Sequence, residues 1–287
     1  MKRMKIKLIV LFSFLFVIPG ALAHELKVLS WNVYMLPRPI KNSLQATRTK
    51  LIAQELQNTS HDLIFMQEAF MKSFRTKIRT SLAKTHPYSI TLNRPKFFVS
   101  VFGSGLFILS RYPMKLIDHV YYRNCAGADC FATKGALLME ITMPGGHKVH
   151  VVNTHLQAIE NRGAIRMKQL SEIHSLLVKH GRPDIPQFLI GDLNIDEVEI
   201  EFQMGLRLLG MTETKLTGDI LYTGGISNPC FKTGASREWI DHMWYSNHYG
   251  ILATEMKVKP YLFNHGGKSC PLSDHHAVEA TFTFSDS

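Results

Sequence analysis

The feature of this sequence that most limits its fold is a series of short apolar runs that each end abruptly in polar residues. Residues 63–66 are followed at once by Gln67 and Glu68, and the run at 188–190 stops at Gly191 and Asp192. Apolar runs this short are typical of buried strands. A strand end holds a side chain rigidly while opening onto solvent, which is how layered α/β folds often present functional residues.

Segments with helical spacing alternate with these strands. Apolar residues three or four positions apart predict helices over residues 44–56, with Ser43 as N-cap, and around residues 170–177. Residues 71–82 are also expected to be helical. Further strands are expected at residues 26–31, 106–109, 136–141, 148–153, 239–244 and 277–284, with Pro144-Gly145-Gly146 as a hairpin turn.

The first 23 residues have the organisation of a secretory signal peptide. Four basic residues lie within the first seven positions, an apolar run follows at 8–18, and Ala21-Leu22-Ala23 resembles a cleavage site. The alternative is a membrane anchor, but the run is shorter than the roughly 20 apolar residues that span a bilayer. We therefore expect a secreted or periplasmic protein in which residues 24–287 form a single domain, because no linker, repeat or low-complexity block divides them.

The net charge and the cysteine content indicate which classes of partner and which compartment suit this protein, but they do not identify a substrate. The net charge of +10 falls to +6 once the four basic residues of the leader are removed. A basic protein suits polyanions and anionic membrane surfaces alike. The four cysteines allow three disulfide pairings in a secreted protein. We favour Cys125 with Cys130 and Cys230 with Cys270, with the pairing left open. No C-x-x-C spacing supports the competing zinc site.

Six short motifs, taken in order, carry a family resemblance. They are Trp31-Asn32-Val33, Gln67-Glu68, Asn153-Thr154-His155-Leu156-Gln157, Gly191-Asp192-Leu193-Asn194, Trp239-Ile240-Asp241-His242 and Ser273-Asp274-His275-His276. The set resembles the endonuclease/exonuclease/phosphatase superfamily over nearly the whole mature chain. The finer match is to bacterial neutral sphingomyelinases, through residues 154–158, the segment 125–129 followed by Lys134-Gly135, and the continuation of Ser273-Asp274-His275 into residues 278–281.

This resemblance implies an α/β fold: a four-layer α/β sandwich of the DNase-I-like kind, in which two mixed β-sheets pack face to face with flanking helices. It also implies a metal ion at one edge of the sandwich. A phosphodiester is anionic and repels nucleophiles, so its hydrolysis needs a hard cation with oxygen ligands. The expected cofactor is Mg²⁺, with Mn²⁺ or Co²⁺ as substitutes. The expected ligands are Glu68 and Asn32, with Asp274 at the metal or its water shell.

The resemblance also implies catalytic roles for the remaining motif residues. His275 is the expected general base for the attacking water, and Asp241 would fix its tautomer. Asp192 and Asn194 would position water and phosphate. His155 is the expected partner acid, which protonates the leaving oxygen or donates a hydrogen bond to a phosphoryl oxygen.

Several other residues have either two possible roles or an expected structural role. Lys134 is either a phosphoryl ligand or a solvated lysine. Trp244 or Tyr245 could face a choline head group from the rim of the site. Residues 261–263 are the available apolar tip for docking on a membrane, in a stretch shorter than the aromatic hairpin of lytic relatives. Structural roles are expected for Arg166, His150, His174, His180, His242 and His276, and a close backbone approach for Gly103-Ser104-Gly105.

The expected reaction is the hydrolysis of sphingomyelin, or a related phospholipid at a membrane surface, to ceramide and phosphocholine. The first alternative is a secreted DNase-like endonuclease, which would need Arg and Lys along both walls of its groove to bind nucleic acid. The second is a phosphatase acting on another lipid or sugar phosphoester, with a deeper basic pocket. The third is a non-catalytic descendant that binds lipid or protein.

Overall fold

The computed structural model describes residues 24–92 and 102–284, apart from positions 160, 183, 232, 235, 247–250 and 253–254. The predicted signal peptide, residues 1–23, lies outside the described residues. Within the described ranges, no helix combines the length and the apolar character needed to cross a bilayer.

The first sheet has the order β10-β13-β16-β1-β2-β4-β3, with β12 paired to β16. It is mixed, because β1 runs parallel to β2 and antiparallel to β16. Its strands are β1 (His24–Asn32), β2 (Leu63–Gln67), β3 (Tyr88–Thr91), β4 (Phe107–Ser110), β10 (Leu216–Thr217), β12 (Ile251–Leu252), β13 (Met256–Lys259) and β16 (Ala277–Phe284).

The second sheet has the order β5-β6-β7-β8-β11-β9 and is also mixed, since only β7 and β8 are parallel among its described pairs. Its strands are β5 (Met114–Tyr121), β6 (Gly135–Thr142), β7 (Lys148–His155), β8 (Gln187–Asp192), β9 (Met211–Glu213) and β11 (Asp241–Ser246).

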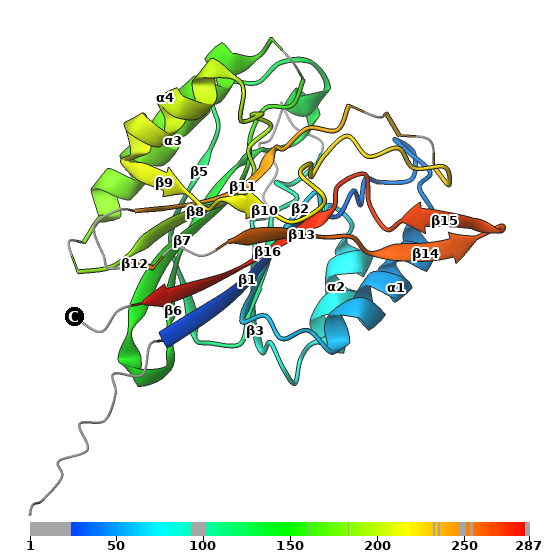
Figure 1. The fold of residues 1–287 in the computed structure, drawn as a ribbon, viewed down its shortest axis with the longest axis horizontal. Helices are drawn as coiled ribbons and strands as arrows, with labels where there is room; N and C mark the ends of the chain where they lie inside the picture. Colours follow the sequence, from blue (N-terminus) through cyan, green and yellow to red (C-terminus); the bar gives the residue numbers. More distant parts are fainter. Residues whose placement is uncertain are drawn as a thin grey trace, which may run out of the picture.

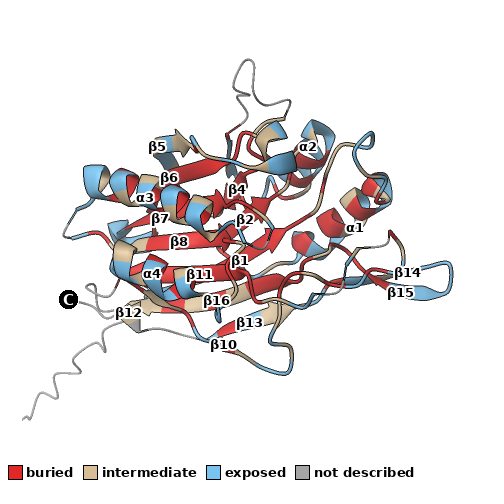
Figure 2. Cartoon of the chain, turned by 90° about the horizontal axis from the view of Figure 1, so that it is seen from above, coloured by how far each residue is buried: buried red, intermediate tan, exposed pale blue. Residues whose placement is uncertain are grey.

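Helices α1 (Gln45–Gln57) and α2 (Lys72–Ser81) cover the outer face of the first sheet, and α3 (Gly163–His180) and α4 (Ile200–Leu209) cover that of the second (Figure 1). Three apolar clusters separate these layers, one between the sheets and one beneath each helix pair. Figure 2 shows the buried strands between helices whose outer faces are exposed. The predicted four-layer sandwich is confirmed.

The continuous apolar runs follow from this layering. In β2, Leu63 and Phe65 face the core between the sheets, while Ile64 and Met66 pack under α1 and α2. Side chains alternate between the two faces of a strand, so a strand covered on both faces must be apolar at every position. The run can stop only where the strand leaves the sandwich, which is where Gln67 and Glu68 lie.

Two local expectations are wrong for identifiable reasons. Ser43 does not cap α1, because the N-cap residue is Leu44, and the buried hydroxyl of Ser43 accepts a hydrogen bond of 3.0 Å from Arg48 Nη1 instead. Trp244 and Tyr245 do not reach the rim of a site. Trp244 lies in the cluster beneath α3 and α4, and Tyr245 lies between the sheets.

The C-terminal hairpin corrects the expected apolar tip. Strands β14 (Leu262–His265) and β15 (Lys268–Pro271) are joined by Gly266 and Gly267, so the tip is polar. Tyr261 lies at its base, buried and stacked on Trp31 with ring centroids 4.8 Å apart. The disulfides Cys125–Cys130 and Cys230–Cys270 are both formed, and the second ties β15 to the loop before β11.

Candidate active site

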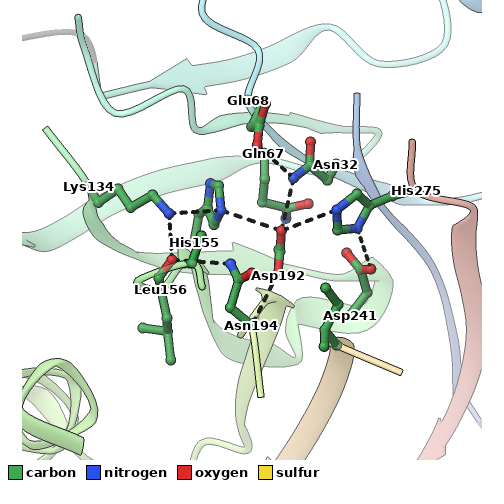
Figure 3. Close-up of polar contacts among 12 residues, drawn as sticks. Asn32, Gln67, Glu68, Lys134, His155, Leu156, Asp192, Asn194, Asp241 and His275 are labelled. Carbon is green, nitrogen blue, oxygen red and sulfur yellow. Dashed lines mark hydrogen bonds and ion pairs between the residues drawn. The ribbon is translucent and has the colours of Figure 1, made fainter. Parts of the chain in front are cut away.

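The proposed site residues converge where parallel strands of both sheets end. Asn32 pairs with Gln67 at the ends of β1 and β2, and His155 pairs with Asp192 at the ends of β7 and β8. Asp241, at the start of antiparallel β11, pairs with Asp192. The two sheets therefore bring residues from distant parts of the chain to one edge of the sandwich (Figure 3).

Gly191 shows how closely the backbone is packed at this edge. Its φ is +149°, and a Cβ there would lie 2.1 Å from the carbonyl oxygen of Thr154 on β7. A side chain is therefore excluded immediately before Asp192. Gly105 plays a similar part beneath Glu68, since its φ is +72° and a Cβ would lie 2.9 Å from the Phe70 ring. This agrees with the close approach expected for residues 103–105.

Asn32 connects the two sheets at the centre of the site. Its Nδ2 donates hydrogen bonds of 2.9 Å to Asp192 Oδ2 and 3.2 Å to Glu68 Oε1. All three side chains are buried or nearly so. Burial raises the pKa of Asp192 to about 6, with Asp241 adding to the effect and His275 opposing it.

His275 and Asp241 form a hydrogen-bonded pair, with Nδ1 donating to Asp241 Oδ2 at 2.8 Å. The other ring nitrogen, Nε2, lies 3.8 Å from Asp192 Oδ2. Burial disfavours the charged imidazole, but Asp241, Asp192 and Asp274 together outweigh it, so the pKa of His275 is raised well above its ordinary value. The arrangement leaves Nε2 as the nitrogen that faces the centre of the site.

His155 lies on the opposite side of Asp192 and has the opposite electrostatic environment. Its Nε2 is 3.4 Å from Asp192 Oδ2 and 3.0 Å from Lys134 Nζ. Burial, then the charges of Lys134 and His275, hold the pKa of His155 well below its ordinary value. The two histidines therefore flank one carboxylate, and their pKa values are shifted in opposite directions.

Lys134 is a site residue rather than a solvated lysine. Its buried ammonium group donates to Asp129 Oδ2 at 2.7 Å and to the carbonyl of Leu156 at 2.6 Å. Asn194 Nδ2 donates to the same carbonyl at 3.2 Å. Asn194 has a φ of 50°, and its backbone N–H donates to Asp192 Oδ1 at 3.0 Å. Lys134 and Asn194 therefore both donate to the Leu156 carbonyl, which fixes the loop after β8 beside the lysine.

Glu68 has the features expected of a metal ligand. It follows β2 with a φ of 53°, in the left-handed region that costs a non-glycine residue free energy. Its Oε2 is buried and has no hydrogen-bond partner among the described residues. Burial, followed by the charge of Asp274, raises the pKa of Glu68 to about 7. A divalent cation bound to Oε2 would supply the missing partner and would stabilise the ionised carboxylate.

The surrounding donors fit a hard cation. Burial raises the pKa of Asp274, while His275 and Arg48 lower it. Carboxylate and amide oxygens are the donors that Mg²⁺ prefers, so Glu68, Asp274 and Asn32 form a chemically suitable set. Asp192, Asp241 and His275 also have potential ligand atoms within 4.8 Å of one another. We favour the first set, because the Asp241–His275 hydrogen bond already occupies atoms that a metal would need.

An apolar cleft of about 510 Å³ opens beside this polar centre. Its floor contains Glu68, Lys134 and His155, and its rim carries the exposed side chains of Ile40 and Phe131. The other lining residues are Leu36, Pro37, Phe70, Phe102, Ala128, Asp129 and Ala132. The aromatic rings that face the site therefore come from loops and not from β11.

Sequence reasoning overlooked one further residue, Arg48. Its side chain is completely buried on the inner face of α1 and has Asp274 and Glu68 among its electrostatic neighbours. The signal was present, because Leu44, Arg48, Ile52 and Leu56 follow one another at intervals of four. A charged residue on the buried stripe of an amphipathic helix indicates a specific partner in the interior.

Comparison with known proteins identifies the family of this chain. The sequence profile described as the endonuclease/exonuclease/phosphatase family matches residues 29–275. The chain belongs to this family.

Similarity to individual proteins is more distant. The chain is 32% identical over 220 residues to Phospholipase C of Staphylococcus aureus, an alignment covering 70% of this chain and 64% of that protein, so it spans less than two thirds of that relative. It is 26% identical over 247 residues to Sphingomyelinase C of Listeria ivanovii, covering 77% of this chain and 72% of that protein. The crystal structure of beta toxin from Staphylococcus aureus superposes with a TM-score of 0.77 at 24% identity, covering 89% of this chain and 99% of that chain.

Proposed function

We propose that this protein is a secreted, Mg²⁺-dependent phosphodiesterase that hydrolyses sphingomyelin to ceramide and phosphocholine. The observation that carries the proposal is the position of the polar centre, which contains Glu68, Asp192, His155 and the Asp241–His275 pair, beside an apolar cleft whose floor includes Glu68 and His155. Such a centre can hold a phosphoryl group while the cleft receives the lipid part of the same molecule.

In the proposed reaction, water attacks phosphorus in line with the leaving oxygen. Bound Mg²⁺ would neutralise phosphoryl charge and stabilise the developing negative charge. His275, held through Nδ1 by Asp241, would accept a proton from the attacking water at Nε2. Asn194 and Asp192 would orient the water and the phosphoryl group, and His155 would donate a hydrogen bond on the leaving-group side.

The lining of the cleft favours a lipid over a nucleic acid. Among the described residues that line it, Lys134 is the only lysine or arginine, and its ammonium group is paired with Asp129. A nuclease groove needs several cationic side chains facing the phosphate backbone.

Relatives named Sphingomyelinase C and a beta toxin structure described with bound magnesium ions support the substrate and the cofactor. The two disulfides support an oxidising compartment.

The test is phosphocholine release from sphingomyelin vesicles by the purified secreted protein, with Mg²⁺ or with EDTA, and with plasmid DNA in a parallel assay. We expect release that requires Mg²⁺, falls at least about a hundredfold in His275→Ala, and leaves the DNA intact. His174→Ala, on the outer layer formed by α3, is the matched control. Nicked DNA with unreacted lipid would reject the sphingomyelinase proposal in favour of a nuclease.

A further inference from the structure

Helix α2 is positively charged along its whole length. It contains Lys72, Arg75, Lys77 and Arg79 but no acidic residue, and residues 69–117 include no Asp or Glu. Lys72 begins the helix, where a cation opposes the helix dipole. Like charges four positions apart, as at Arg75 and Arg79, repel each other. The charge therefore destabilises the helix itself, and binding of an external anion would account for it.

Three of these cations line a groove between α2 and β3, which is the edge strand of the first sheet. The groove has a volume of about 210 Å³ and contains Lys72, Arg75 and Arg79, which lie three and four positions apart on one face of the helix. The other lining residues are Thr76, Ser89, Ile90, Thr91 and Phe107, so the described lining includes no carboxylate. A phosphate group placed there would meet cations and hydroxyl groups without facing a negative charge.

Arg75 is fixed in this groove by backbone oxygens of its own segment. Its side chain is buried, and Nη1 donates hydrogen bonds of 2.5 Å to the carbonyl of Ala69 and 2.7 Å to that of Phe70. Burial, and then the charge of Arg79, lower the pKa of Arg75. Its Nε and Nη2 have no hydrogen-bond partner among the described residues. A buried guanidinium group without a carboxylate partner is uncommon, and its remaining donors match the oxygens of a phosphate.

Lys72 and Arg79 form the rim of the groove. Both side chains are exposed, and neither forms an ion pair with a residue that the structure describes. Other exposed cations of this protein are paired, as Lys148 is with Glu140 at 2.8 Å. The two rim cations are therefore available to an anion from outside the protein, with Arg75 fixed between them.

The size and position of the groove favour the head group of a lipid over a nucleic acid. Its three cations converge on one small cavity, whereas a nucleic-acid backbone needs cations spread along several phosphates. Phe70, whose carbonyl Arg75 binds, also lines the apolar cleft, so the groove adjoins the proposed substrate site. Basic clusters hold proteins on membranes that contain anionic lipids. Sphingomyelin has no net charge, so such a site would add an attraction that the substrate itself does not provide.

We propose that the groove between α2 and β3 binds the phosphate group of an anionic phospholipid and so holds the protein on negatively charged membranes. The bound lipid is a neighbour of the substrate and not the substrate itself. The proposal involves no covalent step and needs neither the metal ion nor the catalytic histidines, so binding can be measured without activity.

The experiment measures cosedimentation of the purified protein, in EDTA, with vesicles of phosphatidylcholine alone or mixed with phosphatidylglycerol. Lys72→Gln and Arg79→Gln each remove one rim charge, and Lys168→Gln, at an exposed position on α3, is the matched control. We expect the wild type to bind only the mixed vesicles, each rim variant to bind them about fivefold more weakly, and the control to resemble the wild type. Thermal unfolding in phosphate-free buffer verifies that all variants are folded.

Other results would overturn the assignment. Equal weakening in Lys168→Gln would show that net charge alone, and not the groove, attracts the protein. A rise in Tm with inorganic phosphate that the rim variants lose, without binding of the wild type to mixed vesicles, would assign the groove to free phosphate. Binding of plasmid DNA that falls in the rim variants, while their vesicle binding is retained, would assign α2 to nucleic acid. Failure of the proposed function is distinguishable, because it appears as a wild type that binds mixed vesicles but does not release phosphocholine.

Discussion

Arg48 Nε donates a hydrogen bond of 2.7 Å to the carbonyl oxygen of Leu272, which lies 224 residues away in the sequence. The same guanidinium group donates to the carbonyls of Val33 and Tyr34 and lies over the Phe231 ring at 4.9 Å. One buried side chain therefore joins the segment after Asn32 to the segment before Ser273-Asp274-His275. It therefore fixes the segment that carries Asn32 relative to the segment that carries Asp274, and both residues are proposed metal ligands.

Arg48→Lys should therefore impair metal binding more than overall stability. Lysine keeps the charge but cannot span these carbonyls with a planar fork. We expect the Mg²⁺ concentration for half-maximal activity, and for half of the Mg²⁺-induced rise in Tm, to increase about tenfold. The control is Arg111→Lys, because Arg111 also binds two carbonyls, those of His61 and Thr59, but at the far end of the first sheet. Identical titrations of both variants would show that Arg48 acts on stability alone.

The Asp241–His275 pair predicts how stability of the metal-free protein depends on pH. Burial opposes the charge on His275, yet the surrounding carboxylates raise its pKa well above normal. The stabilisation is complete below the unfolded pKa of about 6.5 and is lost as pH rises through the higher folded pKa. In EDTA, the Tm of the wild type should thus fall more between pH 6 and 9 than that of Asp241→Asn. Parallel Tm profiles of the two proteins would contradict this account.

Glu68 should lower stability until a cation binds. Burial and Asp274 raise its pKa to about 7, so its contribution to stability diminishes as pH rises from about 4.5 through 7. At pH 8 in EDTA, Glu68→Gln should be more stable than the wild type by on the order of 2 kcal/mol, and Mg²⁺ should no longer raise its Tm. Denaturant unfolding with and without Mg²⁺ measures both effects, and a destabilised variant would refute the prediction.

The Cys230–Cys270 disulfide should contribute more to stability than Cys125–Cys130. It closes a segment with a sequence separation of 40, against 5 for the other bond. Loop-closure entropy then gives about 3–4 kcal/mol for the longer segment. Urea unfolding of Cys230→Ser/Cys270→Ser and Cys125→Ser/Cys130→Ser measures the two contributions. A larger loss in the second double variant would disprove the expected order.

Hydrophobic pattern alone predicted much of the framework. The strand expected at residues 277–284 has the same bounds as β16, and residues 63–66 are β2 apart from its terminal Gln67. β2 is buried along its whole length, and β16 alternates buried apolar positions with part-exposed polar ones, so composition and spacing identify both strands. The short strands β9, β10 and β12 were not predicted, because two or three residues at a sheet edge carry no readable period.

The sequence by itself determined that polar motifs end the strands and that Glu68, Asp192 and His275 belong together. It could not show which core receives Trp244, because alternation gives the relation between neighbouring side chains but not the layer that each enters. Nor could it assemble Ile40, Phe102 and Phe131 around one cleft, or place Arg48 against Leu272. Those contacts join loops far apart in the chain, and only the packing of two sheets against each other brings such loops to one edge.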